Sequence, residues 1–460
     1  VNNAAKDILV FSYIGMRTQE IHVKGKTTIN VTLQSDAKAL DEVVVVGYGT
    51  SKRSDLTGSV VSVKSEDLMK MPTSDVTQAL AGRVAGVQIT QSEGAPGSTI
   101  SIRVRGGISI TQSNEPLYII DGFPSEDGMS TIDPAEIETI DILKDASATA
   151  IYGARGANGV VVITTKRGNK DGSKMSISFD SYVGVKTLAR KLPVLSTKEF
   201  VLLDYERRLQ FDGETGVKSF QSIYGSFLDI NENYGNYAGI DWQEETLGRT
   251  TTSQNYRVRI SGGNKELQYS LNYTYFKDLG AMLYSGNDKH NISFSLSHKP
   301  TKRISVNARV NYDQTYIYGM GTSDQSTRFN KMEHILQYRP TKGIYGDDES
   351  LLKSEEDNIT DEEGNPMQNP LTSAAEEINK RQLRTFQANG GLIFNIAKGL
   401  NFRNNTGMRY QTTRFDVFYG EKSSNGKRSS ANGYIQYAEN SSFQTSNVLN
   451  YEYKKKKHKL

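Results

Sequence analysis

The stretch that decides the fold of this chain runs Tyr256-Arg257-Val258-Arg259-Ile260-Ser261-Gly262-Gly263-Asn264-Lys265-Glu266-Leu267-Gln268-Tyr269-Ser270-Leu271-Asn272-Tyr273-Thr274-Tyr275. Apolar and polar residues alternate on both sides of Gly262-Gly263-Asn264, which is a turn sequence. A period of two places the apolar residues of a strand on one face and the polar residues on the other. The stretch therefore predicts two antiparallel strands, each with one apolar face.

The same alternation recurs throughout residues 169–460. Further strands are predicted at 175–185, at 292–296 and 304–312 around a turn at 299–302, at 386–396 and 400–410 around a turn at 397–399, and at 442–453. Tight turns alternate with long connections, such as 187–253 and 313–383. Short turns at one end of the strands and long loops at the other are typical of an outer-membrane barrel, and tyrosines at strand ends suit a membrane interface.

We therefore predict a mainly β protein in which residues 169–460 form the N-terminal part of a transmembrane antiparallel β-barrel. About eight strands are counted, roughly the first eight of the ~22 that a barrel with a plugged lumen needs. A soluble β-sandwich is the alternative interpretation. The mean hydropathy of −0.54 does not decide between them, because a barrel alternates lipid-facing and lumen-facing residues.

The composition excludes several kinds of site. Without cysteine the chain has no disulfide and no thiolate metal site, and its five histidines show no ligand spacing. A net charge of +3 with mixed signs gives no attraction to nucleic acid. Residues 153–159 lack the Gly-Lys-Ser/Thr ending of a phosphate loop. Residues 347–363 are acidic but lack EF-hand spacing, so a solvated loop is favoured over a calcium site. No enzyme activity, cofactor or metal is expected.

The pattern of residues 51–168 predicts a compact mixed α/β domain that precedes the barrel. Asp75 is placed to cap a short helix that ends at Gly82. Strands are expected at 86–90, 98–105, 117–120, 137–144 and 159–165, with a short helix at 145–152. A domain of this size, directly before a barrel, is suited to plug its lumen.

Apolar and polar residues alternate in the stretches 8–13 and 28–33, which predicts that residues 1–34 are the end of a small β-sandwich. Residues 35–50 form a linker. The chain begins Val1-Asn2-Asn3 and stops after a lysine-rich turn, so we expect it to be a fragment of a longer protein.

The linker contains four consecutive valines, Val43-Val44-Val45-Val46, which favour an extended backbone. The flanking sequence does not indicate a turn that would pair the run into a hairpin. An unpaired extended strand invites strand addition by a partner protein. The alternative is an ordinary buried strand of a neighbouring domain.

On these motifs the chain resembles the SusC/RagA family of TonB-dependent outer-membrane transporters. Leu40-Asp41-Glu42-Val43-Val44-Val45-Val46-Gly47-Tyr48-Gly49-Thr50 is similar to the family's Ton box. Arg103-Val104-Arg105-Gly106, the segment 116–122 and the long segment 142–161 resemble its plug motifs. Residues 1–34 are similar to the end of the carboxypeptidase-regulatory-like extension that many members carry.

The resemblance implies active import of an oligosaccharide or oligopeptide across the outer membrane of a Gram-negative bacterium. Its implied partners are a SusD-like surface lipoprotein that lids the barrel, TonB energised by ExbB and ExbD, and outer-membrane lipid. Uptake of a siderophore or another iron chelate, and a surface binding or signalling receptor, are the alternatives.

The resemblance also implies two sets of functional residues. The TonB-binding residues are Asp41, Glu42, Val43, Val44, Val45, Val46, Gly47, Tyr48 and Gly49. The plug-motif residues are Arg103, Arg105, Asp121, Gly122, Lys144, Asp145, Tyr152, Gly153, Arg155, Gly156 and Gly159. The charged members are candidates for contacts between plug and barrel wall, with an ordinary surface charge as the alternative for each. Trp242 and Tyr234 are candidate sugar-stacking platforms, while the substrate-binding residues are unknown.

Overall fold

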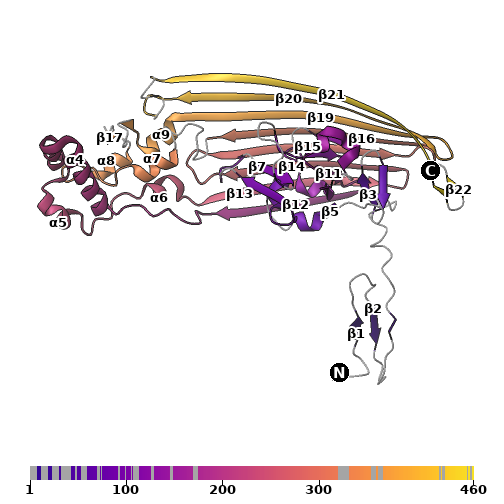
Figure 1. Cartoon of the computed structure of the whole chain (residues 1–460), viewed down its shortest axis with the longest axis horizontal. Coiled ribbons are helices and arrows are strands. Elements are labelled where there is room, and N and C mark those ends of the chain that lie inside the picture. Colours follow the sequence, from indigo (N-terminus) through magenta and orange to yellow (C-terminus); the bar gives the residue numbers. More distant parts are fainter. Residues whose placement is uncertain are drawn as a thin grey trace.

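The computed structural model describes residues 8–11, 19–22, 31–32, 43–46, 49–52, 60–69, 73, 75–91, 94–98, 100–104, 106, 113–125, 129–145, 149–168, 175–319, 331–353, 359–360, 366–423, 426, 430–452, 454–455 and 458–459. Three bodies make up most of this structure (Figure 1). A large curved sheet forms a wall, a small α/β domain lies against its concave side, and a group of helices covers one end.

The wall is an antiparallel sheet of eight strands in the order β12-β13-β14-β15-β16-β19-β20-β21. The strands are β12 (Ser176–Lys186), β13 (Thr251–Gly263), β14 (Leu267–Leu279), β15 (Gly286–His298), β16 (Ile304–Tyr318), β19 (Glu377–Ala397), β20 (Leu400–Tyr419) and β21 (Asn432–Tyr451). The predicted mainly β fold with a large antiparallel sheet is confirmed. The later strands are longer than expected, so the connection placed at 313–383 shrinks to residues 319–376.

The two faces of the wall have inverted polarity. Its convex face carries the alternating apolar residues, such as Phe179 (64% exposed) and Phe294 (39% exposed). Its concave face carries buried polar residues, including Asn255, Ser270 and Thr385. A soluble protein would bury the apolar face instead, so this arrangement suits a wall with lipid outside and protein or water inside.

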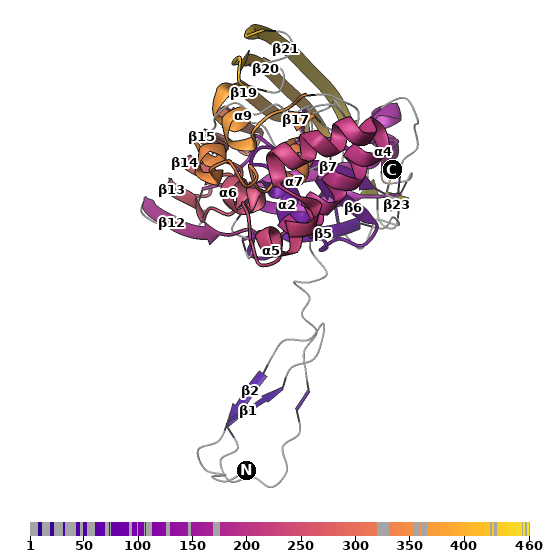
Figure 2. The same ribbon diagram turned by 90° about the vertical axis from the view of Figure 1, so that its left-hand side faces the viewer.

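The plug is the α/β domain on the concave side of the wall (Figure 2). Its main sheet has the order β5-β10-β11-β8-β9. The strands are β5 (Val60–Lys64), β10 (Ile137–Leu143), β11 (Val160–Thr165), β8 (Leu117–Ile120) and β9 (Phe123–Ser125), and a separate hairpin joins β6 (Val87–Gln91) to β7 (Ile100–Val104). The centre of the plug is an apolar core, in which Ile137, Ile140 and Ile142 are all at 0% exposure.

Short helices connect the strands of the plug: α1 (Ser65–Leu68), α2 (Val76–Leu80), η2 (Pro134–Glu136) and η3 (Ala150–Gly156). The predicted cap is present, because the Asp75 side chain accepts a hydrogen bond from Thr77 N at the start of α2. A short helix is predicted at 145–152, of which residues 146–148 lie outside the described part; Thr149 is helical, and the 3-10 helix η3 follows and ends at Gly156. Gly153 interrupts η3 with φ 61°, a left-handed conformation that glycine adopts readily.

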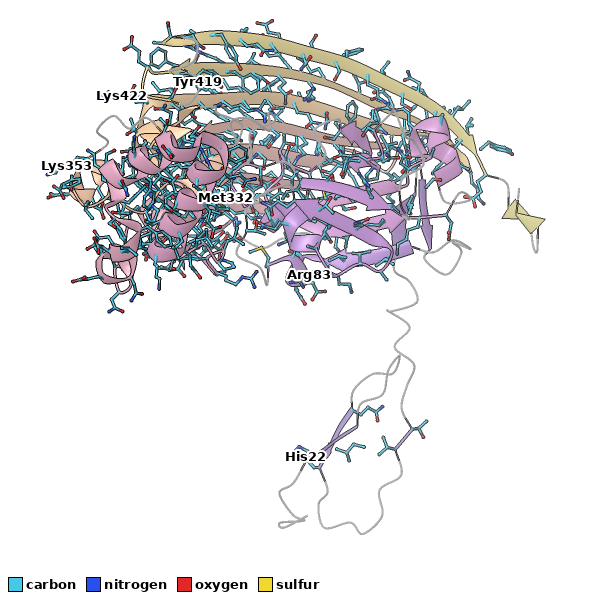
Figure 3. All side chains as sticks on the ribbon, turned by 60° about the vertical axis from the view of Figure 1, so that its left-hand side comes forward. His22, Arg83, Met332, Lys353, Tyr419 and Lys422 are labelled. Carbon is cyan, nitrogen blue, oxygen red and sulfur yellow. The ribbon has the colours of Figure 1, made fainter. Side chains whose placement is uncertain are left out.

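The loop end of the wall carries the cap, formed by residues 187–250, 280–285 and the described part of 319–376. Its helices are α4 (Thr197–Tyr224), η4 (Phe227–Asp229), α5 (Ile230–Tyr234), α6 (Trp242–Leu247), α7 (Lys331–Gln337), α8 (Asp348–Leu352) and α9 (Pro370–Glu376), with a small pair β17 (Ile359–Thr360) and β18 (Pro366–Met367). Lys353, Tyr419 and Lys422 mark this end in Figure 3. No helix in the described part of the chain is long and apolar enough to cross a membrane.

The valine run forms a hairpin, which corrects the expectation that it lacks a local partner. β3 (Val43–Val46) pairs antiparallel with β4 (Gly49–Lys52). The prediction was wrong because Gly49-Thr50-Ser51-Lys52 has no alternating apolar residues to mark it as a strand. Two further small hairpins pair β1 (Ile8–Phe11) with β2 (Gln19–His22) and β22 (Lys454–Lys455) with β23 (His458–Lys459).

The inverted polarity of the wall leads to a testable difference between two substitutions. Phe294→Arg introduces a charge in the middle of the convex face, whereas Ile396→Arg introduces one beside the turn that follows β19. We expect Phe294→Arg to destabilise the full-length protein in membranes by about 2–4 kcal/mol and Ile396→Arg by about 0–1 kcal/mol. Urea unfolding of the protein in liposomes measures both, and equal costs at the two sites would contradict a lipid-facing convex surface.

Candidate plug–wall interface

A capped turn before β10 carries the plug residues that contact the wall. Asp133 is the N-cap of η2, and its Oδ1 accepts a hydrogen bond from Ala135 N at 2.7 Å. Pro134 occupies the first position of η2, where its missing N–H costs nothing. The turn fixes the carboxylates of Asp133 and Glu136 close together on the side of the plug that faces the wall.

Two arginines of the wall bind these carboxylates. Arg257 Nη2 on β13 lies 2.6 Å from Asp133 Oδ1, and Arg309 Nη2 on β16 lies 2.5 Å from Glu136 Oε2. All four side chains are at most 8% exposed. We call Arg257, Asp133, Arg309 and Glu136 the arginine–carboxylate latch.

Polar contacts beside the latch extend the same interface. Asn291 Nδ2 and Asn311 Nδ2, on neighbouring strands, both donate to the backbone oxygen of Thr131, at 2.9 and 3.2 Å. Lys289 Nζ donates to Ser130 O and lies 3.5 Å from Asp313 Oδ2. The segment 130–136 of the plug is thus held by side chains from β13, β15 and β16.

The energetics of the latch favour a contact that holds firmly and still separates. Removing one member of a buried ion pair typically costs about 3–5 kcal/mol, because the other charge stays buried without its partner. When both charges move into water together, hydration replaces much of the lost attraction. Arg257 Nε and Glu136 Oε1 also have no hydrogen-bond partner among the described residues, so the pairing is incomplete.

The edge of the plug beside the latch is positively charged. Burial lowers the pKa of the Lys166 ammonium, and the charges of Arg259 and Arg257 lower that pKa further. Arg259 on β13 also donates to the backbone oxygen of Arg167 at 3.1 Å. Asp133 and Glu136 therefore supply needed negative charge where the plug meets this part of the wall.

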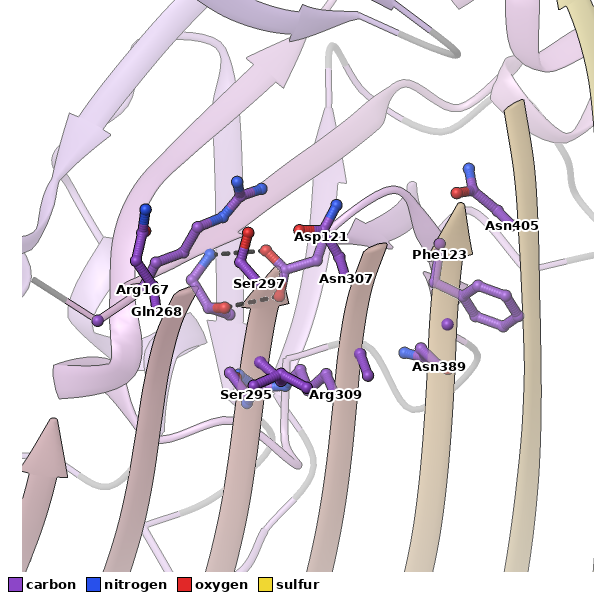
Figure 4. A pocket seen from close by; sticks show the side chains of 16 residues that line it. Asp121, Phe123, Arg167, Gln268, Ser295, Ser297, Asn307, Arg309, Asn389 and Asn405 are labelled. Carbon is purple, nitrogen blue, oxygen red and sulfur yellow. Dashed lines mark hydrogen bonds between the residues drawn. The ribbon is translucent and has the colours of Figure 1, made fainter. Parts of the chain in front are cut away.

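A cavity of about 80 Å³ separates the plug from the wall next to Arg309 (Figure 4). Its lining includes Asp121, Phe123, Arg167 and Asn389. Asp121 Oδ1 accepts from Thr165 N at 2.9 Å, and its Oδ2 accepts from Thr165 Oγ1 at 2.6 Å. A cavity of this size that is lined in part by polar side chains has room for ordered water.

Several of the predicted plug-motif residues form turns and contacts within the plug. Asp121 and Gly122 adopt positive φ (49° and 88°) in the turn between β8 and β9. Lys144 Nζ donates to Ala85 O within the plug. Gly159, at φ 94°, packs so closely on Val104 that a Cβ there would lie 3.0 Å from the Val104 side chain.

The other predicted residues differ in their surroundings. Arg103 is exposed on β7, Tyr152 packs on a small apolar cluster in the plug, and Asp145 has partners of its own. Gly153 and Gly156 shape η3. Arg155 is exposed and lines a second space of about 400 Å³, together with Arg409 of the wall.

Several predicted residues lie outside the described part of the chain. These are Arg105 of the plug motif and Asp41, Glu42, Gly47 and Tyr48 of the TonB-binding set. Val43, Val44, Val45, Val46 and Gly49 are described as strand residues of the β3–β4 hairpin. Their role in binding TonB stays a prediction.

Sequence reasoning missed all four latch residues. Arg257 and Arg309 occupy lumen-facing positions of alternating strands, where a buried charge needs a partner. Asp133-Pro134-Ala135-Glu136 carries the signature of a capped turn. These signals point to the arginines and to the carboxylates separately, but the sequence does not say which arginine pairs with which carboxylate.

The proposed sugar platforms are corrected by the structure. Trp242 is 3% exposed and Tyr234 is 4% exposed. Trp242 lies in the apolar cluster of the cap and donates from Nε1 to Arg339 O at 2.9 Å. Both rings hold the cap together, so neither presents a face to a sugar.

The acidic stretch at 347–363 contains no metal site in its described part. Asp347 caps α8, and Asp348 accepts hydrogen bonds from Thr341 Oγ1 and Lys342 N. No group of three or more histidine, aspartate or glutamate side chains suited to a metal ion occurs among the residues that the structure describes.

Comparison with known proteins identifies the architecture. The model of the TonB-dependent Receptor Plug Domain family matches residues 52–160. TonB-dependent receptor P26 of Formosa agariphila is 38% identical over 379 residues, which cover 82% of this chain and 36% of that protein. The chain belongs to the SusC-like family of TonB-dependent transporters. Members of this family are outer-membrane β-barrels and not enzymes.

Two further comparisons concern the family and the fold, respectively. TonB-dependent receptor SusC of Bacteroides thetaiotaomicron is 38% identical over 299 residues, which cover 63% of this chain and 28% of that protein. The structure of the RagAB peptide importer in the 'open-open' state superimposes with a TM-score of 0.72 at 23% identity, covering 90% of this chain and 47% of that one. The chain spans about two fifths of the length of the curated relatives it matches, or less.

A double substitution tests the latch in the full-length protein. Arg309→Met leaves the Glu136 carboxylate buried without its partner, so we expect the plug to lose about 3–5 kcal/mol of stability. Adding Glu136→Gln removes the stranded charge and should recover most of that loss. Hydrogen exchange of residues 129–143 reports the change.

A matched control for this test is Arg414→Met. Arg414 Nε lies 2.8 Å from Asp416 Oδ1 in an exposed pair on the wall, so its loss should cost about 0–1 kcal/mol. If Arg309→Met and Arg414→Met have the same effect on exchange, the latch does not hold the plug.

Proposed function

We propose that the full-length protein imports an oligosaccharide or an oligopeptide across the outer membrane of a Gram-negative bacterium, using energy delivered by TonB with ExbB and ExbD. The observation that supports this most directly is the plug seated against the polar face of the wall by the arginine–carboxylate latch. A passive pore has no need of a plug, and a static receptor has no need of contacts that separate at moderate cost.

The interface suits a plug that is moved by force. The polar groups that hold segment 130–136 become hydrated as the plug is displaced, so the free energy that a pull must supply is modest. The apolar core of the plug, by contrast, is buried, and its members are at most 6% exposed. Displacement of the plug along the wall therefore costs less than unfolding of its core.

The cap supports the proposal that a SusD-like lipoprotein covers the extracellular end. Residues from three separate connections pack into one apolar cluster: Trp242, Leu247, Met282, Ile335, Tyr338, Leu351, Met367 and Ala374. Arg249 strengthens this packing, since its Nη2 donates to Gly280 O at 2.6 Å and to Met282 O at 2.7 Å. A cap folded in this way offers a preformed platform, which lowers the entropic cost of docking a second protein.

Uptake by whole cells tests the transport proposal. Labelled oligosaccharides and oligopeptides are offered to cells that make the full-length protein, with and without TonB and with and without a proton uncoupler. We expect uptake of one substrate class to fall at least tenfold when either TonB or the proton gradient is removed. Uptake that persists in both conditions would mean that the protein is a passive pore.

Deletion of the plug gives a complementary prediction. Because the concave face of the wall is polar, removal of residues 51–168 should leave a water-filled channel. We expect entry of a large antibiotic such as vancomycin to become independent of TonB, while the intact protein excludes it. Surface levels of the two proteins are compared by immunoblotting, and a deletion variant that reaches the membrane without admitting the antibiotic would contradict a plug role for these residues.

Affinity purification tests the lid. We expect gentle detergent extraction of native outer membranes to recover the transporter and a SusD-like lipoprotein in near-equal amounts. The control is Trp242→Ala, which removes the centre of the cap cluster and should release the lipoprotein without removing the barrel from the membrane. Recovery of the wild-type transporter alone, even after crosslinking, would argue against a lid.

A further inference from the structure

The turn between β8 and β9 carries an aromatic side chain to the wall. Phe123 is the first residue of β9 and is 8% exposed. It pairs with Ile120 across the turn residues Asp121 and Gly122. The Asp121 carboxylate accepts two hydrogen bonds from Thr165 of β11. The turn is therefore tied to a central strand of the plug, which fixes the place of the Phe123 ring.

A glycine of the wall receives this ring. Gly407 of β20 is buried and lies directly opposite Asn389 of β19. A Cβ atom at position 407 would lie 2.7 Å from Phe123 Cε1 and 2.6 Å from Asn389 Oδ1, closer than real Cβ atoms approach other heavy atoms. Figure 4 shows Phe123 between the side chains of Asn389 and Asn405. The ring thus occupies the space that a side chain at position 407 would need.

Two hollow spaces meet at the Phe123 ring. Phe123 and Asn405 both line the cavity of about 80 Å³, whereas Phe123 and Arg409 both line the space of about 400 Å³. Asn405 and Arg409 lie two residues to either side of Gly407, so all three share one face of β20. β20 begins after the turn at 397–399 and ends at the cap. The smaller cavity therefore adjoins the ring on the side of the turns, and the larger space adjoins it on the side of the cap.

We propose that Phe123 is the gate of the import passage. Seated on Gly407, the ring separates the two spaces. When the plug moves, the ring leaves the glycine and the spaces join into one polar route along β19 and β20. The inference rests on the proposed function, in which TonB moves the plug, and it assigns the side of the plug along which the oligosaccharide or oligopeptide passes.

The chemistry of the ring suits a seal. The spaces on either side are lined mainly by polar side chains, so both have room and partners for water. A large apolar group at the narrowest point of a polar passage excludes water and the ions that water carries. A polar residue in place of Phe123 would instead extend the hydrated lining from one space to the other.

The larger space suits a polar oligomer. Its polar lining comes from Arg155, Gln387, Arg409, Ser442 and Gln444, which offer donors and acceptors to hydroxyl and peptide groups. A volume of about 400 Å³ also lies within the range of small-molecule sites. A few units of a substrate chain can therefore wait on the cap side of the ring until the plug moves.

The contact between Phe123 and Gly407 separates without leaving a charge unpaired. The latch arginines stand on β13 and β16, whereas Gly407 lies on β20. Glycine has no side chain to interlock with the ring, and the dispersion contacts of single atoms are weak. Movement of the plug therefore opens this contact without the cost of stranding a buried ion.

Ion conductance of the purified full-length protein in planar lipid bilayers tests the gate in the absence of TonB. Phe123→Ala removes the ring, and we expect the conductance in potassium chloride to rise about fivefold or more above that of the unmodified protein. Gly407→Leu forces the ring from its seat and should also raise the conductance. In the double variant the leucine fills the space that the ring leaves, so the conductance should return to within about twofold of the unmodified level.

Two matched controls separate a gate from a general effect on the protein. Ile142→Ala weakens the core of the plug, where Ile142 is at 0% exposure, and leaves the ring in place. Phe386→Ala removes an aromatic ring from the convex face of the wall, where Phe386 is 36% exposed. We expect both controls to conduct within about twofold of the unmodified protein, and thermal unfolding establishes that each variant is folded.

Three outcomes would each overturn the gate. These are an unchanged conductance in folded Phe123→Ala, an equal rise in Ile142→Ala, and a double variant that conducts as much as Phe123→Ala. The bilayer contains no TonB, so these outcomes do not depend on energised transport. The proposed function fails by a different result, which is uptake by cells that persists without TonB and without the proton gradient.

Discussion

Backbone hydrogen bonding within the membrane is the constraint on which this structure depends. No water is available in the hydrocarbon region, so each N–H and C=O group must find a partner within the protein. The eight strands of the wall meet this requirement through continuous ladders, such as the twenty residue pairs that join β20 to β21. Once the ladders are fixed, the side chains must alternate between lipid and lumen. The polar lumen face follows, and it determines what kind of plug the wall can hold.

The plug combines a conventional apolar core with a polar outer surface. Most of its buried isoleucines and valines pack against one another in a single cluster. Its contact with the wall relies on charge pairing at Asp133 and Glu136 and on amide contacts at Thr131. The core of the plug and the plug–wall contact respond differently when water reaches them. Hydration compensates for the loss of polar contacts but not for the loss of apolar burial.

Local patterns in the sequence identified the strands because a period of two is visible in any stretch of ten residues. They identified the ends of strands poorly: in β20, polar residues such as Gln411, Thr412 and Thr413 continue the ladder beyond the predicted end at residue 410. The β3–β4 hairpin was missed because Gly49-Thr50-Ser51-Lys52 has weak strand propensity. The latch was missed because its partners lie 124 and 173 residues apart, and no local pattern sets the register between plug and wall.

The polarity of the concave face has a consequence for the transport cycle proposed above. If the wall were apolar, displacement of the plug would expose an apolar surface to lipid and to unfolded chains. These would adhere to the surface and prevent the plug from returning. Here the vacated surface presents asparagine, serine, threonine and arginine side chains such as Asn291, Ser293 and Arg309. Such a surface attracts water and little else, so the displaced segment meets no adhesive competitor when it comes back. In the proposed transport cycle, this surface chemistry favours return of the plug to its place on the wall.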